Sequence, residues 1–197
     1  STDDLVRVRI EPDRQEVRAG DRAAFQAVTG GANAVQYQWM HFGLPIQGAT
    51  NSTLVLDSTQ SDSRGGYSVT VSNLTGNVFS TEAWLDVRLP PVIGGLSTTN
   101  RLPEGRAYRL DRLQVGGDSP RSFQWQFGGV DIPGETNLVF GIQAVAPSHA
   151  GEYQLRVSNP YGTTVSAPFR LEVVPRSPLD EWTWRVPVPQ GNDLFAI

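Results

Sequence analysis

Residues that could perform acid–base or metal chemistry are few in this sequence and lie far apart. The 197 residues include two histidines, His41 and His149, and no cysteine. Neither histidine has a nucleophile or a second metal-ligating residue at a spacing typical of a catalytic or metal site. Carboxylates are spread over stretches that are typical of turns, among them Asp57, Asp62, Asp111, Asp118, Glu135 and Glu152.

These patterns predict no catalytic residue, no metal ligand and no cofactor. A pair of carboxylates acting as in glycoside hydrolases stays open, although a small domain leaves little room for the cleft that such a pair needs. The lack of cysteine excludes disulfides and thiolate sites. The start, Ser1 to Asp4, shows neither the basic nor the apolar region of a signal peptide, so we expect a mature chain or a fragment of a longer one.

Charge and hydropathy exclude two classes of partner. The net charge is −4, and the 16 basic residues are all arginine and are scattered along the chain. A nucleic-acid-binding protein needs a basic patch, which this distribution does not supply. No apolar run approaches the ~20 residues that span a bilayer. We therefore expect neither nucleic-acid binding nor membrane insertion.

The chain repeats itself at an offset of 86 residues. Between 37–87 and 123–173, 16 of 51 positions are identical without a gap. Such similarity predicts two copies of one small domain. The repeated aromatic residues, which we take as the signature of each core, are Trp39 and Tyr67 in the first copy and Trp125 and Tyr153 in the second.

The repeat also predicts the domain organisation. We expect the first domain over 1–89, the second over 90–175, and a tail over 176–197. The join is Leu89-Pro90-Pro91. Proline fixes φ and favours extended geometry, so this linker should be short and semi-rigid.

Each copy alternates apolar and polar residues with a period of two. Turn signals such as Gly30-Gly31, Gly43 and Gly65-Gly66 separate the alternating stretches, and no stretch shows a helical stripe. This pattern predicts an all-β chain of two antiparallel β-sandwiches. The apolar positions of the first copy are Ala23, Phe25 and Ala27; Val35, Tyr37 and Trp39; Leu54 and Leu56; Tyr67, Val69 and Val71; and Ala83, Leu85 and Val87.

The recurring motif resembles an I-set-like immunoglobulin domain over residues 5–88 and 92–174. It comprises Gln38-Trp39, Gly43, Ile46, Gly48-Ala49-Thr50-Asn51, Gly65-Gly66-Tyr67, Val71-Ser72-Asn73 and Gly76. More narrowly, it is similar to the cysteine-free version found in tandem in large secreted or cell-surface bacterial proteins. The resemblance implies two immunoglobulin-like sandwiches in an extracellular setting.

The resemblance also implies a brace that this chain alters. The family usually has an aspartate four residues before the tyrosine near strand F, where this chain has Ser63 and His149. We therefore expect the loop before Tyr67 or Tyr153 to be braced more weakly or by different contacts.

The resemblance places the family's two disulfide positions at Ala27 and Val69, and at Leu113 and Leu155. A disulfide contributes ~2–4 kcal/mol, and burying one aliphatic side chain contributes ~1.5–3 kcal/mol. An apolar pair can therefore offset the missing bridge. Because the Ala27–Val69 pair is the smaller, we expect Phe25 to fill volume in the first domain, or that domain to be the less stable.

The repeat slips by one residue near Asp111-Arg112. Before this point the apolar alternation runs in one phase, and after it in the other, which predicts a β-bulge there. The residues that define the two phases are Tyr108 and Leu110, then Leu113 and Val115.

Exposed aromatic residues are the best indication of binding. Alternation places Trp84 on the outer face of a strand, between Ala83 and Leu85. It would serve as a platform for sugars or partners, or pack on the linker or a neighbouring domain, which is the interpretation we favour. The other candidates for a binding surface are Phe42, Phe127 and Tyr161 near turns, and Trp182 and Trp184 in the tail.

The tail alternates large apolar residues over 182–188 and carries prolines at 187 and 189, which suit an edge strand. It resembles the start of a β-propeller that follows such repeats. We expect it to pack on the second domain or on an assembly neighbour; pairing in cis and pairing in trans both stay open.

The resemblance implies a non-catalytic spacer, adhesion or assembly module of a larger extracellular or cell-surface bacterial protein. Its partners would be proteins or neighbouring domains of the same polypeptide. The alternative is a carbohydrate-binding module that uses the exposed aromatic residues, with a glycan as partner.

Overall fold

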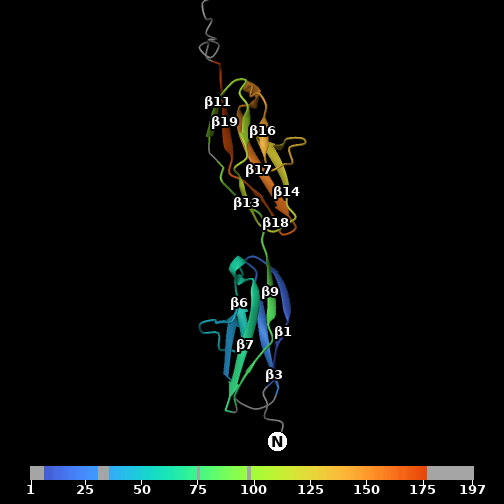
Figure 1. Ribbon diagram of the computed structural model, residues 1–197. Coiled ribbons are helices and arrows are strands. Elements are labelled where there is room, and N and C mark those ends of the chain that lie inside the picture. The colour runs from blue at the N-terminus through green and yellow to red at the C-terminus, as the bar shows by residue number, and fades with distance from the viewer. Residues whose placement is uncertain (1–6, 31–35, 75, 97–98, 177–197) are drawn as a thin grey trace, which may run out of the picture.

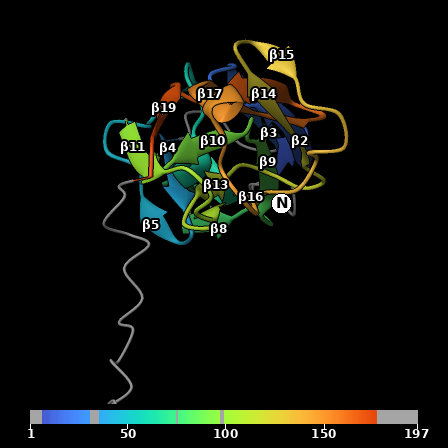
Figure 2. The same ribbon diagram turned by 90° about the horizontal axis from the view of Figure 1, so that it is seen from above.

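The computed structural model describes residues 7–30, 36–74, 76–96 and 99–176. These residues form two β-sandwiches placed end to end and joined by a single pass of the chain (Figure 1). Figure 2, seen from above, shows the strands of the two sandwiches overlying one another. The expectation of an all-β chain is confirmed. No helix of the described part is long and apolar enough to cross a membrane.

The first domain packs a three-stranded sheet against a larger sheet. The alternation of the sequence puts one face of each sheet into the core between them. Strand β2 pairs in parallel with β9, and the other pairs are antiparallel. The small sheet comprises β1 (Arg7–Glu11), β3 (Ala23–Gly30) and β6 (Thr53–Leu56). The large sheet comprises β2 (Arg14–Arg18), β9 (Ala83–Arg88), β7 (Gly65–Asn73), β4 (Gln36–His41) and β5 (Leu44–Pro45), with β8 (Gly76–Phe79) also on β7.

The second domain repeats the large sheet but divides the small one. Its large sheet comprises β11 (Thr99–Pro103), β19 (Phe169–Val174), β17 (Gly151–Asn159), β14 (Ser122–Phe127) and β15 (Val130–Asp131), with β18 (Gly162–Val165) also on β17. Opposite it lie two separate pairs, β10 (Val92–Gly94) with β13 (Gln114–Gly116) and β12 (Tyr108–Leu110) with β16 (Phe140–Ile142).

The β-bulge predicted at Asp111-Arg112 is wrong. In the first domain, β3 runs unbroken and pairs with β6 through its first half and with β1 through its second. In the second domain, residues 111–113 lie between two strands that pair with different partners. The extra residue therefore breaks the strand instead of bulging within one ladder. The break lets Leu113 return to the core, where it is 9% exposed.

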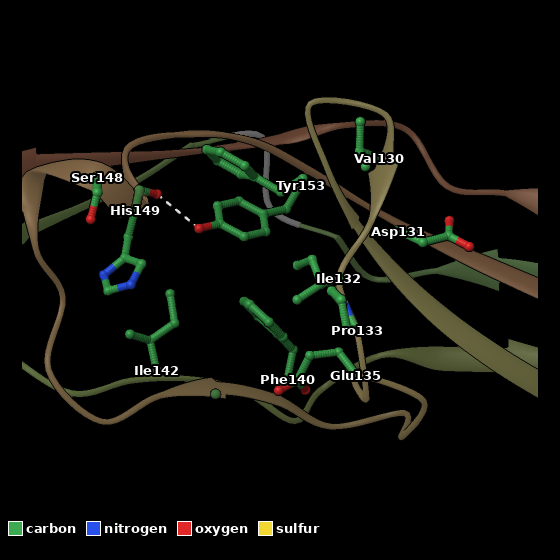
Figure 3. Close-up of a pocket in the computed structure, with 12 residues that line it drawn as sticks. Val130, Asp131, Ile132, Pro133, Glu135, Phe140, Ile142, Ser148, His149 and Tyr153 are labelled. Carbon is green, nitrogen blue, oxygen red and sulfur yellow. Dashed lines mark hydrogen bonds between the residues drawn. The ribbon is translucent and has the colours of Figure 1, made fainter.

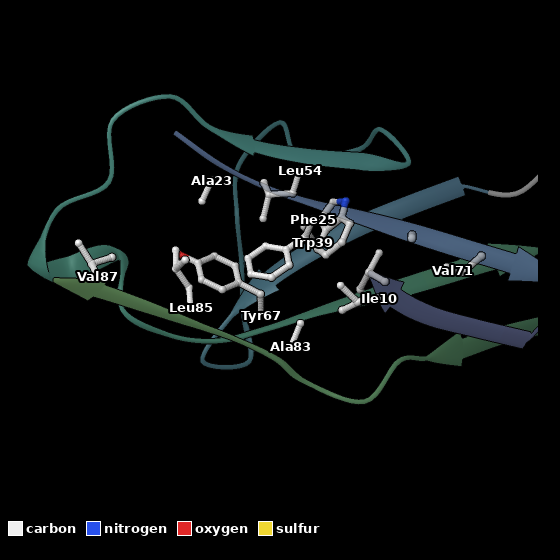
Figure 4. Packing of buried hydrophobic residues seen from close by; sticks show 12 residues of the cluster. Ile10, Ala23, Phe25, Trp39, Leu54, Tyr67, Val71, Ala83, Leu85 and Val87 are labelled. Atoms are coloured by element: carbon white, nitrogen blue, oxygen red, sulfur yellow. The ribbon is translucent and has the colours of Figure 1, made fainter. Parts of the chain in front are cut away.

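The core of the first domain surrounds the signature residues Trp39 and Tyr67, which are both buried (Figure 4). Ala27 and Val69 lie in the same cluster, with Val69 fully buried. Ile10 is the cross-strand neighbour of Ala27 and is also buried, so it adds the volume that the small alanine leaves. In the second domain Leu113 and Leu155 belong to one cluster with Trp125 and Tyr153.

The two domains fill the space beside the signature tyrosine from opposite sheets. In the first, the ring of Phe25 from β3 stacks on Tyr67 with 5.3 Å between centroids. In the second, Phe169 from β19 stacks on Tyr153, also at 5.3 Å. The repeat position of Phe169 is Ala83 in the first domain. The phenylalanine that stacks on the tyrosine thus comes from the small sheet in the first domain and from the large sheet in the second. The lower stability expected for the first domain stays a prediction.

We expect Phe25→Ala to destabilise the first domain by ~3–5 kcal/mol, because the truncation leaves a cavity against Tyr67 that the sheets cannot fully close. Guanidinium denaturation followed by tryptophan fluorescence measures the change in the transition of that domain. The matched control is Phe79→Ala, since Phe79 is 66% exposed; it should change stability by no more than ~0.5 kcal/mol. Equal effects of the two substitutions would contradict the stacked-ring account.

Candidate interaction surfaces

The loop before each signature tyrosine is braced by a different side chain in each domain. The hydroxyl of Tyr67 donates to the carbonyl of Ser63 at 2.8 Å, and that of Tyr153 to the carbonyl of His149 at 2.9 Å. Ser63 Oγ accepts the backbone N–H of Gln60, and His149 Nδ1 accepts that of Ala146. Serine and histidine therefore cap the same turn of the loop through different atoms.

Other repeated residues hold the sheets by hydrogen bonds that recur at the same distances. The indole N–H of Trp39 donates to the carbonyl of Asn51 at 2.9 Å, and Trp125 donates to Asn137 at 2.9 Å. The hydroxyl of Ser80 accepts the backbone N–H of Val69, where sequence comparison places a family cysteine. Ser166 does the same for Leu155. Trp39 and Trp125 thus serve the scaffold, as His149 does, and so does His41, whose Nε2 lies 3.0 Å from the carbonyl oxygen of Arg64.

Phe42 and Trp84 come together on the outer face of the first domain. Trp84 is 43% exposed and Phe42 61%, and their rings meet edge to face with 6.5 Å between centroids and 81° between planes. The indole N–H of Trp84 donates to Asp86 at 3.4 Å. Trp84 therefore packs on Phe42 of its own domain and not on the linker. Packing of its exposed part on a domain outside this chain stays a prediction.

Phe42 has an unfavourable backbone conformation. Its φ is +49°, and no other non-glycine residue of the described ranges has a positive φ. An L-residue with a bulky side chain rarely adopts this region. The repeat position in the second domain is Gly128, which has φ +55° and pays no such penalty. The first domain thus covers Gly65 with a ring from a position of positive φ, whereas the second covers Gly151 with the ring of the preceding position, Phe127.

The other aromatic candidates do not join this surface. Phe127 lies on the second domain, where its ring contacts Tyr153 at 4.8 Å. Tyr161 lies where the domains meet, with the guanidinium of Arg88 5.7 Å from the centroid of its ring. Trp182 and Trp184 lie outside the described residues. The sequence could rank these residues as exposed but could not group them, because they are brought together or separated by strand pairing.

A polar joint fixes the linker between the domains. Arg64 of the first domain binds the carboxylate of Asp118 in the second with two bonds of 2.7 and 2.6 Å. Asp118 also accepts the backbone N–H of Leu89, and the backbone N–H of Asp118 donates to the carbonyl of Leu89. Asn159 donates to that same carbonyl at 2.8 Å. The linker is therefore held by side chains from both domains.

The sequence offered no signal for this joint. Asp118 stood out only as an isolated carboxylate in a turn, and Arg64 was one of many scattered arginines. Asn159 is the repeat position of Asn73, so the sequence indicates only a turn residue that recurs in both copies. In the structure Asn159 donates to the linker. The pairing of Arg64 with Asp118 spans 54 positions and depends on how the two domains are placed.

The joint keeps Asp118 ionised. Burial of its carboxylate raises the pKa of Asp118, but the hydrogen bonds from Arg64 and from the backbone of Leu89 outweigh this effect. The positive charges of Arg64 and Arg88 act in the same direction, so the pKa of Asp118 is lowered overall. The ion pair therefore persists at neutral pH.

The second domain has an apolar groove of about 470 Å³ at the open edge between β15 and β16 (Figure 3). Tyr153, Phe140 and Ile142 form its walls, and the hydrogen bond from Tyr153 to His149 closes one end. Its polar lining comprises Asp131, Glu135, Ser148 and His149, and Nδ1 of His149 is engaged by the backbone N–H of Ala146. Among the described residues no group of three or more His, Asp or Glu side chains is placed to hold a metal ion.

Comparison with known proteins identifies the fold. No family model matches the chain. The crystal structure of DIP-gamma IG1+IG2 superposes with a TM-score of 0.63 at 15% identity, covering 87% of this chain and 98% of that one. The N-terminal four Ig domains of Dscam1 isoform 7.44 give a TM-score of 0.55 at 20% identity, covering 82% and 43%. The chain consists of two tandem immunoglobulin-like domains.

Curated relatives are longer than this chain. Mouse B-cell receptor CD22 is 29% identical over 135 residues, which are 65% of this chain and 16% of the relative. Protein borderless of Drosophila melanogaster is 24% identical over 190 residues, 87% of this chain and 26% of the relative. The chain thus spans about a quarter or less of the curated relatives that it matches.

We expect Tyr153→Phe to destabilise the second domain by ~0.5–1.5 kcal/mol, because it removes the hydrogen bond to His149. The matched control is Tyr108→Phe in the same core. Within the described ranges, the buried hydroxyl of Tyr108 has no hydrogen-bond partner. Its removal should leave stability unchanged or raise it. Chemical denaturation of both variants measures the difference, and a larger loss for Tyr108→Phe would contradict the assignment.

We expect both domains to lose stability in alkaline solution. Burial, with a smaller effect of Asp62, raises the pKa of Tyr67 from 10.0 to about 12, and burial with Tyr153 raises that of Tyr108 to about 12. The pKa of each tyrosine is higher in the folded state than in the unfolded state. The contribution of the neutral tyrosine to the free energy of unfolding is therefore complete below pH 10 and is lost as pH rises through 12. Melting temperatures at pH 9 and above pH 11 measure the loss. Tyr67→Phe should reduce it for the first domain, and an unchanged pH dependence would contradict the assignment.

Proposed function

We propose that the chain is a non-catalytic spacer that presents an adhesion or assembly surface within a larger extracellular or cell-surface protein. Its units are a first domain over 1–89 and a second over 90–175. The partners are proteins or neighbouring domains of the same polypeptide. The bacterial origin and the propeller-like tail implied by sequence resemblance stay predictions. The tail lies outside the described residues, and the relatives above that carry an organism name come from animals.

The observation that carries the spacer role is the joint between the domains. Two independent domains on a flexible linker need no contacts with that linker. Here the Leu89 backbone is bound through both its N–H and its carbonyl. Beyond it, the hydroxyl of Thr164 donates to the carbonyl of Pro91 at 2.6 Å. A joint built in this way holds two domains in line, which is what a spacer requires.

The adhesion role draws on the relatives and on the surface. Dscam2 of Drosophila melanogaster, 28% identical over 143 residues, is a cell adhesion molecule by name. Because the chain spans only 7% of that protein, the role is a proposal for this chain. The exposed pair Phe42 and Trp84 supplies a surface on which recognition can act.

Carbohydrate binding is the second candidate, because it too would use the exposed Trp84. A sugar ring stacks flat on an aromatic face, and a chain of sugars needs several faces in one plane. The planes of Phe42 and Trp84 are 81° apart, so the two rings cannot form one platform. We therefore favour recognition of a protein.

We expect Asp118→Ala to release the joint, because the substitution removes both bonds to Arg64 and the acceptor for the Leu89 backbone. The chain has no native cysteine, so spin labels can be attached at Gln47→Cys and Gln143→Cys, one on each domain. Electron–electron distance measurements should give a narrow distribution in the parent and a broad one in Asp118→Ala. The control is Asp57→Ala, an exposed carboxylate of the first domain. A parent distribution as broad as that of the variant would contradict the spacer role.

The same labels test the pH dependence of the joint. Since the pKa of Asp118 is lowered in the folded chain, its contribution is present above the ordinary aspartate range. It is lost only as pH falls through the depressed value. The distribution should therefore stay narrow at neutral and mildly acidic pH and broaden only in stronger acid.

A further inference from the structure

A carboxylate lies beside the two exposed aromatic rings of the first domain. A Cβ added to Gly66 would stand 2.7 Å from Glu82 Oε2, so this carboxylate lies directly over the bare glycine. Gly66 is the cross-strand neighbour of Trp84. Its carbonyl accepts the backbone N–H of Phe42 at 3.0 Å. Strand pairing thus brings Phe42, Glu82 and Trp84 together around Gly66, and we call these three side chains the Trp84 cage.

The charge of Glu82 is not neutralised within the domain. Neither an ion pair nor a hydrogen bond engages this carboxylate in the described part of the chain. The neighbouring acid, Asp86, is paired with Arg14 and accepts the indole N–H of Trp84. The one cation recorded over an aromatic ring in the described ranges is Arg88 over Tyr161. Arg14 is the cross-strand neighbour of Trp84, but it is held by Asp86 and lies over neither ring.

The second domain keeps the fold without the pair of exposed rings and without the carboxylate, although the ring of Phe127 covers Gly151 there as Phe42 covers Gly65 here. Phe42 holds its ring at a positive φ, whereas the repeat position is a glycine. The scaffold thus requires neither a side chain at positive φ nor the bare glycine beneath the carboxylate. The residues at the repeat positions of Phe42, Gly66, Glu82 and Trp84 are Gly128, Glu152, Pro168 and Arg170.

Perpendicular aromatic walls beside a free carboxylate suit a cation. A cation is attracted to the face of a tryptophan or phenylalanine ring, and aromatic cages recognise cationic groups in this way. A guanidinium has a further advantage, because it stacks flat on an indole while its N–H groups donate to a carboxylate in its own plane. The net charge of −4 favours the approach of a basic partner.

We propose that the Trp84 cage binds an arginine side chain of a protein partner. The guanidinium stacks on Trp84, donates to Glu82, and is bounded on one side by the ring of Phe42. This assignment rests on the proposed recognition function and names the chemistry that the partner must present. It does not depend on the joint, so a failed test here leaves the spacer role standing.

The test is a titration of the ¹⁵N-labelled full chain with Nα-acetyl-arginine amide, followed by NMR through the indole N–H of Trp84. The matched probe is the citrulline analogue, which has the same shape without the charge. We expect the arginine probe to shift the indole signal with a millimolar Kd, as befits one side chain. The citrulline probe should not shift it, and added salt should weaken binding, because the carboxylate is exposed.

Two variants and a control locate the binding. Glu82→Gln should weaken the arginine probe about fivefold, the upper range for an exposed ion pair. Phe42→Gly restores the residue of the second domain and should also weaken binding. Relief of the positive φ should offset part of the packing that is lost over Gly65. The control is Glu152→Gln, which removes a carboxylate from the matching face of the second domain and should bind like the parent. Unchanged ¹⁵N spectra elsewhere show that the variants are folded.

Several results would overturn the proposal. They are the absence of any shift at Trp84, equal shifts with the citrulline probe, and unchanged binding in Glu82→Gln. A shift with cellobiose but not with the arginine probe would assign the surface to a glycan instead. Shifts that grow with protein concentration alone would assign it to a second copy of the chain.

Discussion

The structure depends on one constraint, which is that each domain must close its two sheets around a buried tyrosine and tryptophan without a disulfide. The tyrosine does this with both ends of its side chain. Its ring takes a stacked phenylalanine in the core, at 5.3 Å in both domains. Its hydroxyl ties the loop that follows the opposite sheet, as Tyr67 does through Ser63. A hydroxyl from Ser80 or Ser166 then anchors the strand position where a cysteine would stand. The signature tyrosine of each domain thus supplies a packing contact through its ring and a polar contact through its hydroxyl.

The same constraint explains why the two domains differ where they do. The space beside the tyrosine can be filled from either sheet, so Phe25 in one domain and Phe169 in the other are equivalent solutions. Close packing requires that volume be conserved, and the identity of the strand that supplies it is secondary. The broken strand of the second domain is tolerated for the same reason, since Leu113 still reaches the core. Repeats can therefore diverge in detail and retain one architecture.

The residues to which we assign a function lie on the surface, apart from the two cores. The residues at the joint and in the Trp84 cage contribute little to either core. Asp118 fixes how the two domains are placed relative to each other. Phe42 holds an exposed ring at a backbone angle that its repeat position, Gly128, adopts as a glycine. A residue that is kept in a strained and solvent-exposed position indicates a role other than folding. A spacer with a fixed joint would hold such a surface at a set distance and direction from its neighbours.

The sequence by itself determined the all-β class, the repeat at 86 residues, and the signature residues of each core. These follow from the period-two alternation and from the identities between the two copies, both of which can be read directly along the chain. The tertiary structure alone decided that the phase change at 111–113 breaks a strand, and that Phe42 meets Trp84 while Tyr161 lies at the joint. It also decided that Arg64 reaches Asp118 in the other domain. Each of these contacts joins residues distant in sequence. Their distances are set by strand register and domain placement, which no local pattern records.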